Sequence, residues 1–218
     1  MTNLQPFTKA TARMLPVILL ADVSGSMSVD GKINALNEAV REMIAAFADE
    51  VAARASIHVA IITFGGQARL HQSLATASDI TWVDMATEGN TPLGAALDLA
   101  SDLIDSRDQL PSTAYRPTVV LVSDGWPNDD WERKLNAFNA GRRTGRTQRL
   151  AMGIGSDADE AMLRRFVVDS DTPIFHAEDA SQIASFFRYV SQSVTVRSRS
   201  TNPNILPQIQ DPNALEEF

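Results

Sequence analysis

Residues Leu15 to Ser26 read LPVILLADVSGS, an apolar run that passes directly into oxygen-bearing side chains. A continuous apolar run is typical of a strand covered on both faces, as the strands of a parallel sheet are. Asp22, Ser24 and Ser26 alternate at its end, and in doubly wound sheets the carboxyl ends of the strands border the crevice where ligands bind. The segment therefore predicts a buried strand that delivers three polar side chains to one edge of a sheet.

Further apolar runs alternate with helical patterns along the rest of the chain. Helical stripes, with apolar residues three and four apart, cover residues 33–51, 93–104, 131–138, 161–166 and 183–190. Strands are expected at 57–62, 119–122, 150–154 and 173–176, with an edge strand within 69–82. This order predicts an α/β fold: a doubly wound, open and mostly parallel sheet, flanked by helices on both faces, with one short antiparallel edge strand.

The length and composition fit one such domain. The chain has 218 residues, of which 44% are hydrophobic, and this is enough for a sizeable core. We expect an N-terminal extension at 1–13, the domain at 14–196 and a C-terminal tail at 197–218. From Ser198 onwards prolines, Asn and Gln replace the helical period, so the tail is expected to be flexible or to lie along the domain or a partner.

Composition also narrows the function. The sequence contains no cysteine, which excludes disulfides and thiolate zinc sites. A net charge of −8 argues against nucleic acid as the main partner and suits the binding of cations. The first residues lack the pattern of a secretory signal, and every apolar run is too short to cross a bilayer. We therefore expect a cytoplasmic protein that binds neither nucleic acid nor membrane.

Two more loops bring oxygen-bearing side chains to the same edge. Thr91 lies in a loop directly before the stripe at 93–104, and Asp124 follows the run at 119–122. Taken alone, Asp22, Ser24 and Ser26 are explained as a turn and helix N-cap, and Thr91 as an N-cap before Pro92. Because the carboxyl ends of parallel strands share an edge, however, all five side chains can meet, and hard cations prefer oxygen ligands. The predicted metal ligands are Asp22, Ser24, Ser26, Thr91 and Asp124.

This set of motifs resembles the metal-ion-dependent adhesion site of von Willebrand factor A domains, over roughly residues 14–195. The resemblance implies that Ser24, Ser26 and Thr91 contact the metal directly, and that Asp22 and Asp124 bind it directly or through water. It implies Mg²⁺, with Mn²⁺ or Ca²⁺ as substitutes, and an open position that an acidic side chain of a partner protein fills. No catalytic residue is implied. More narrowly, the TerY-like tellurium-resistance branch is similar at residues 15–27, 61–64, 91–97 and 123–129.

The TerY-like branch implies a scaffold module in a bacterial stress-response system, such as tellurite resistance or phage defence. Its implied partners are a protein kinase and a PP2C-type protein phosphatase. Two other functions stay open: a Mg²⁺-dependent phosphohydrolase, and a subunit that serves an AAA-type ATPase. The phosphohydrolase is disfavoured, because we would expect an Asp-x-Asp pair after the first strand, where the chain has Asp22-Val23-Ser24.

Other residues near these motifs have a simpler explanation beside a functional one. Trp126 is either a partner anchor or a packing residue, whereas Trp131 is expected to pack the following helix. Asp129 and Asp130 are expected to cap a helix rather than to form a second cation site. A basic stretch is expected to be a solvated helix face, with binding of phosphate or an acidic partner as the alternative. It consists of Arg133, Lys134, Arg142, Arg143, Arg146 and Arg149.

Overall fold

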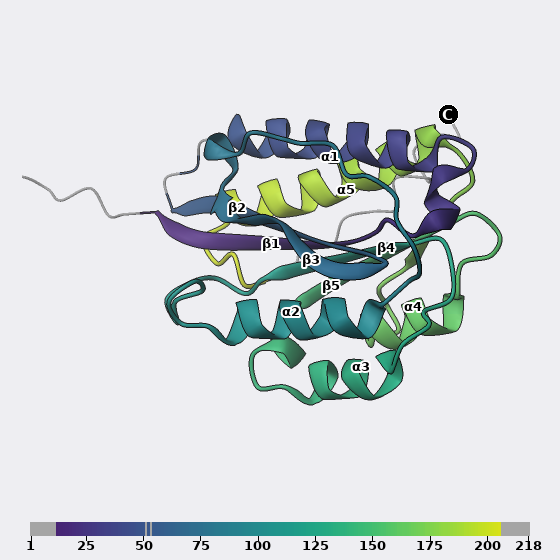
Figure 1. The fold of residues 1–218 in the computed structure, drawn as a ribbon. Helices are drawn as coiled ribbons and strands as arrows, with labels where there is room; N and C mark the ends of the chain where they lie inside the picture. Colours follow the sequence, from purple (N-terminus) through teal and green to yellow (C-terminus); the bar gives the residue numbers. More distant parts are fainter. Residues whose placement is uncertain (1–11, 51, 53, 206–218) are drawn as a thin grey trace, which may run out of the picture.

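The computed structural model describes residues 12–50, 52 and 54–205, which form one six-stranded sheet with helices on both sides (Figure 1). The strand order is β3-β2-β1-β4-β5-β6. The strands are β1 Arg13–Asp22, β2 Ala55–Gly65, β3 Gln67–Thr76, β4 Thr118–Ser123, β5 Gln148–Ile154 and β6 Ile174–Ala177. The helices are α1 Lys32–Ala48, α2 Leu93–Asp105, α3 Trp131–Ala140, α4 Glu160–Val167 and α5 Ala180–Arg199, with short 3₁₀ turns η1 Gly25–Ser28, η2 Ala77–Asp79 and η3 Thr144–Arg146.

The sheet separates two apolar cores. Helices α1 and α5 cover one face, and α2, α3 and α4 cover the other (Figure 1). Along β1, Val17 and Leu19 pack into the first core while Ile18 and Leu20 pack into the second, because successive side chains of a strand point to opposite faces. Both faces are therefore buried, which explains why the sequence of this strand is apolar without interruption.

The predicted fold class is confirmed. All neighbouring strands pair in parallel except β2 and β3, which are antiparallel. The register pairs Ala21 of β1 with Val122 of β4, so these two adjacent strands end side by side. The predicted ligands Asp22 and Asp124 are thereby delivered to the same edge of the sheet. None of the helices in the described part of the chain is long and apolar enough to cross a membrane.

The last helix continues beyond the predicted end of the domain. α5 runs to Arg199, and the side chain of Arg197 is completely buried. Its guanidinium donates hydrogen bonds to the carbonyls of Pro203 and Arg116 and to the side chains of Thr118 and Gln148. Burial, and secondarily the charge of Arg116, lowers the pKa of Arg197 to about 10. Hydrophobic periodicity overlooks this anchor because it counts arginine as polar.

Some predictions fall outside the described residues. They concern residues 1–11 of the predicted N-terminal extension, Val51 at the end of the first helical stripe, and residues 206–218 of the predicted tail.

Candidate metal centre

Three loops meet at the carboxyl edge of the sheet and are joined through their backbones. The loop before α2 is attached to the turn after β1, because the Glu88 amide donates to the Val23 carbonyl at 2.7 Å and the Gly25 amide donates to the Gly89 carbonyl at 2.9 Å. The loop after β4 joins them where the amide of Asn128 donates to the carbonyl of Thr91 at 3.2 Å. Their relative positions are therefore fixed by the main chain rather than by flexible side chains.

One glycine is needed for this close approach. A Cβ atom added at Gly65 would lie 2.4 Å from the carbonyl oxygen of Val23 and 2.7 Å from that of Glu88. Both neighbours are backbone atoms, which cannot rotate away. The end of β2 therefore has to be a residue without a side chain if the turn after β1 and the loop before α2 are to pack against it.

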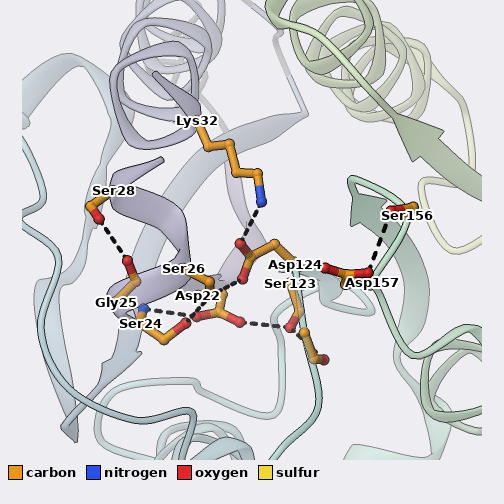
Figure 2. Close-up of polar contacts among 11 residues, drawn as sticks. Asp22, Ser24, Gly25, Ser26, Ser28, Lys32, Ser123, Asp124, Ser156 and Asp157 are labelled. Carbon is orange, nitrogen blue, oxygen red and sulfur yellow. Dashed lines mark hydrogen bonds and ion pairs between the residues drawn. The ribbon is translucent and has the colours of Figure 1, made fainter. Parts of the chain in front are cut away.

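Four of the five predicted ligands belong to one network of hydrogen bonds (Figure 2). The carboxylate of Asp22 is buried and accepts from the Ser24 amide at 2.9 Å and from the Ser123 hydroxyl at 2.7 Å. The hydroxyls of Ser24 and Ser26 lie 3.0 Å apart, and that of Ser26 donates to Oδ1 of Asp124 at 2.7 Å. Residues that are 98 positions apart in the sequence are thus in direct contact.

The fifth predicted ligand, Thr91, lies on the adjoining loop. It is 9% exposed, and its main-chain carbonyl accepts hydrogen bonds from the amides of Leu93 at the start of α2 and of Asn128 after Asp124. The structure thus brings all five residues to the place that the sequence predicts, with Thr91 connected to the others through the backbone. Their role as metal ligands remains a prediction.

Sequence reasoning missed Lys32, the first residue of α1. Its ammonium donates to Oδ2 of Asp124 at 2.8 Å, and Figure 2 shows it reaching from the helix to the carboxylate. The side chain of Asp124 is fully buried and that of Lys32 is 22% exposed. One signal was available: a lysine is unfavourable at the positive end of a helix dipole, so a lysine that begins a helix needs a carboxylate partner.

The electrostatics favour a cation. Burial raises the pKa of Asp22 above its ordinary value of 3.8, hydrogen bonds from Ser123 and Ser24 oppose this, and the nearby charge of Asp124 adds to it. With both carboxylates ionised and the Lys32 ammonium present, the network carries one negative charge in excess (−2 + 1 = −1). An additional positive charge would relieve the repulsion between the two carboxylates.

The donors fit a hard divalent cation. They are carboxylate and hydroxyl oxygens, the ligand type that magnesium, manganese and calcium share, whereas neither thiolate nor imidazole belongs to the set. The described residues contain no group of three or more His, Cys, Asp or Glu side chains that could hold a metal. Binding here would therefore depend on the hydroxyls of Ser24, Ser26 and Thr91 as much as on the two carboxylates.

The neighbouring acids and tryptophans have separate roles. Asp129 accepts from the amides of Gly94 and Ala95 at 3.0 Å each, so it caps a helix as predicted, although this helix is α2 rather than α3. Trp131 packs against the core on the α2 side of the sheet, as predicted. Trp126, two residues after Asp124, is 70% exposed, which is unusual for a large apolar side chain.

Comparison with protein families identifies the fold. The model of the von Willebrand factor type A domain matches residues 17–188, most of the chain. The chain belongs to this family. One similar structure is a mussel byssus proximal thread matrix protein 1 with a zinc-occupied MIDAS motif, at 16% identity and a TM-score of 0.66 over 84% of this chain. No curated protein sequence matches the chain.

Two further structures show the same von Willebrand type A fold. A von Willebrand factor type A protein from Catenulispora acidiphila is 21% identical over 84% of this chain, with a TM-score of 0.63. The manganese-loaded TRAP protein of Plasmodium vivax is 19% identical over 79%, with a TM-score of 0.58. This chain spans 42% and 71% of the length of these two structures and 46% of the mussel protein. These likenesses show the fold.

Proposed function

We propose that this von Willebrand type A domain is a binding module that uses a divalent cation to capture an acidic side chain of a partner protein. The observation that carries the proposal is the buried network of Asp22, Ser24, Ser26 and Asp124, assembled from two loops and joined through the backbone to a third. Similar structures whose sites hold zinc or manganese support a divalent cation.

The chemistry of these side chains explains why a partner would be needed. Ser24, Ser26 and Thr91 would offer uncharged hydroxyls, and Asp22 and Asp124 would supply two negative charges. A bound Mg²⁺, Mn²⁺ or Ca²⁺ supplies a coordination position for an incoming carboxylate. The ammonium of Lys32 would leave the loaded site with one positive charge in excess, which attracts an anionic ligand. Trp126, two residues after Asp124, is exposed and suits contact with a protein.

The finer context of the proposal rests on resemblance. The motifs similar to TerY-like proteins support a cytoplasmic, non-enzymatic role in bacterial stress response, with a protein kinase and a PP2C-type phosphatase as partners. Mg²⁺ is the proposed metal because it is the usual ion of the resembled site.

The test compares metal binding and partner capture in Asp22→Ala and Asp124→Ala with the wild type. We expect calorimetric titration with Mg²⁺ to give no signal for either variant. In affinity purification, the wild type should capture a partner in Mg²⁺ but not in EDTA, and the two variants should not capture it even in Mg²⁺. Asp157→Ala is the control, because this exposed acid lies near the same edge but outside the network. Circular dichroism checks that each variant folds.

Three results would contradict the proposal. Capture that is the same for all variants in Mg²⁺ and in EDTA would refute metal-dependent binding. Hydrolysis of generic phosphate esters that requires Mg²⁺ and is lost in Asp22→Ala would indicate a phosphohydrolase instead. Copurification with an AAA-type ATPase would favour a role as an ATPase subunit.

A further inference from the structure

A second candidate site lies at the opposite end of the strands. A cavity of about 420 Å³ is bordered by the end of α2, by the loop that leads to β4 and by the segment after α3. Five arginines and no acidic residue line it. The arginines are Arg107, Arg116, Arg142, Arg143 and Arg146.

This arginine cavity is separate from the metal centre. Arg116 precedes β4 and Asp124 follows it, so the six residues of the strand lie between them, roughly 20 Å at about 3.3 Å per residue. Figure 1 shows the same separation, because the loop after α2 lies at the end of the sheet away from η1. A ligand in the cavity would therefore not contact the predicted metal ligands.

The described residues do not neutralise the positive charges of the cavity. None of its five arginines forms an ion pair with the part of the chain that the structure describes. The basic stretch predicted from the sequence thus divides in three: Arg133 and Lys134 pair with Asp130 and Asp98, Arg149 is buried in β5, and no described acidic residue pairs with the three members in the cavity. For a chain with a net charge of −8, this concentration of unpaired cations is unusual.

Arg143 provides the most specific observation. Its Nη2 donates to the carbonyl of Leu110 at 2.6 Å, which fixes the guanidinium at the cavity wall. Its Nη1 is buried, and no atom of the described residues accepts a hydrogen bond from it. Buried guanidinium donors are normally paired, because an unsatisfied one is unfavourable. A solvated surface explains exposed arginines, but it does not explain this buried nitrogen.

We propose that the arginine cavity binds a phosphoryl group, carried either by a small molecule or by a phosphorylated peptide. Guanidinium groups bind phosphate oxygens through paired, charge-assisted hydrogen bonds, and several of them can surround one dianion. Leu110, Pro111 and Tyr115 give the cavity an apolar wall for the rest of the ligand. The lowered pKa of Arg197, to which the charge of Arg116 contributes after burial, agrees with uncompensated positive charge in this region.

The test is calorimetric titration of the whole chain in EDTA with pyrophosphate, with a phosphothreonine peptide and with the same peptide unphosphorylated. The double variant Arg142→Gln, Arg146→Gln removes two exposed cavity arginines, and we expect it to weaken binding of the phosphorylated probes by at least about tenfold. The matched control is Arg54→Gln, Arg188→Gln, two exposed arginines that do not line the cavity, for which binding stays unchanged. The single variant Arg107→Gln tests the other wall.

Each outcome decides the matter. Binding that persists in EDTA and in Asp124→Ala supports a site separate from the metal centre. Tighter binding of pyrophosphate indicates a small molecule as the source of the phosphoryl group, and tighter binding of the phosphothreonine peptide indicates a phosphorylated peptide. The proposal is overturned if neither phosphorylated probe binds at millimolar concentration, if the unphosphorylated peptide binds equally well, if EDTA abolishes binding, or if the control double variant weakens it as much as the cavity variant does.

Discussion

Replacing Lys32 by methionine should tighten metal binding. The ammonium contacts Oδ2 of Asp124 at 2.8 Å and supplies the single positive charge of the network. A cation bound by the same carboxylate would be repelled by this ammonium. Lys32→Met keeps an unbranched side chain that lacks only the terminal ammonium, so the network of the variant has two negative charges where the wild type has one in excess (−2 + 1 = −1).

The size of the effect follows from Coulomb's law. A divalent cation about 2.1 Å from a carboxylate oxygen would lie roughly 5 Å from the ammonium, and with the screening of water their repulsion is about 1.7 kcal/mol. Screening is weaker than in bulk water where the ammonium is 22% exposed and Asp124 is fully buried, so this figure is a lower bound. Since about 1.4 kcal/mol corresponds to a factor of ten, the Kd for Mg²⁺ should fall at least about tenfold. Salt weakens the effect, so buffers of low ionic strength are needed.

Isothermal titration with Mg²⁺ measures this change, and Lys32→Arg is the control because it retains the charge. We expect the arginine variant to bind like the wild type. Capture of an acidic partner should change in the opposite direction and weaken in Lys32→Met, since the loaded site of that variant is neutral. A folded Lys32→Met protein whose Kd for Mg²⁺ is equal to or higher than that of the wild type would refute this account.

Three other predictions concern the stability of the domain. Gly65→Ala should lower the free energy of unfolding by about 2 kcal/mol, because its Cβ would meet two backbone carbonyls. Urea unfolding measures this, with Gly125→Ala as the control, because no atom lies within 4 Å of a Cβ added there. Asp22→Asn should abolish Mg²⁺ binding, yet stabilise the domain at pH 7 in EDTA. Burial raises the pKa of Asp22, so its charged form costs stability increasingly as pH rises above the ordinary value of 3.8. Glu50→Gln should lower the free energy of unfolding by at most about 1 kcal/mol at pH 7, since the Arg199 partner is 69% exposed. The hydrogen bond from Arg199 lowers the pKa of Glu50, so this contribution is lost as pH falls below the ordinary value of 4.5. In urea titrations, the variant and the wild type should then become equally stable.

The fold could be predicted because burial on both faces leaves a direct mark on the sequence. Val17 and Ile18 enter different cores, so residues 15–21 of β1 are all apolar, and the same holds for residues 119–122 of β4. β3 is an edge strand whose side chains are mostly exposed or half-buried, and its sequence carries a weaker signal. The edge strand could be placed only within a range for this reason.

The candidate site could be predicted in part for a related reason. Asp22 and Asp124 each follow a buried strand, and parallel strands bring their ends together, so position in the sequence was enough. Ser123 and Lys32 were missed because their contacts depend on three-dimensional packing: the hydroxyl of Ser123 reaches across from β4 to Asp22, and Lys32 reaches Asp124 only because α1 begins above the sheet edge. The position of Lys32 at the start of a helix indicates a carboxylate partner, but no sequence pattern identifies which carboxylate it is.

The two proposed sites constrain the partners that could use them together. Both would bind anions, one through a cation at the end of β4 and the other through arginines before its start, roughly 20 Å away at about 3.3 Å per residue. An extended peptide needs at least about six residues to cover such a distance in a straight line, and more to pass around the helices that cover the sheet. A short acidic or phosphorylated motif would therefore occupy one site at a time. Simultaneous engagement requires either a large partner surface or two ligands, and binding of a short phosphopeptide should then be insensitive to Mg²⁺.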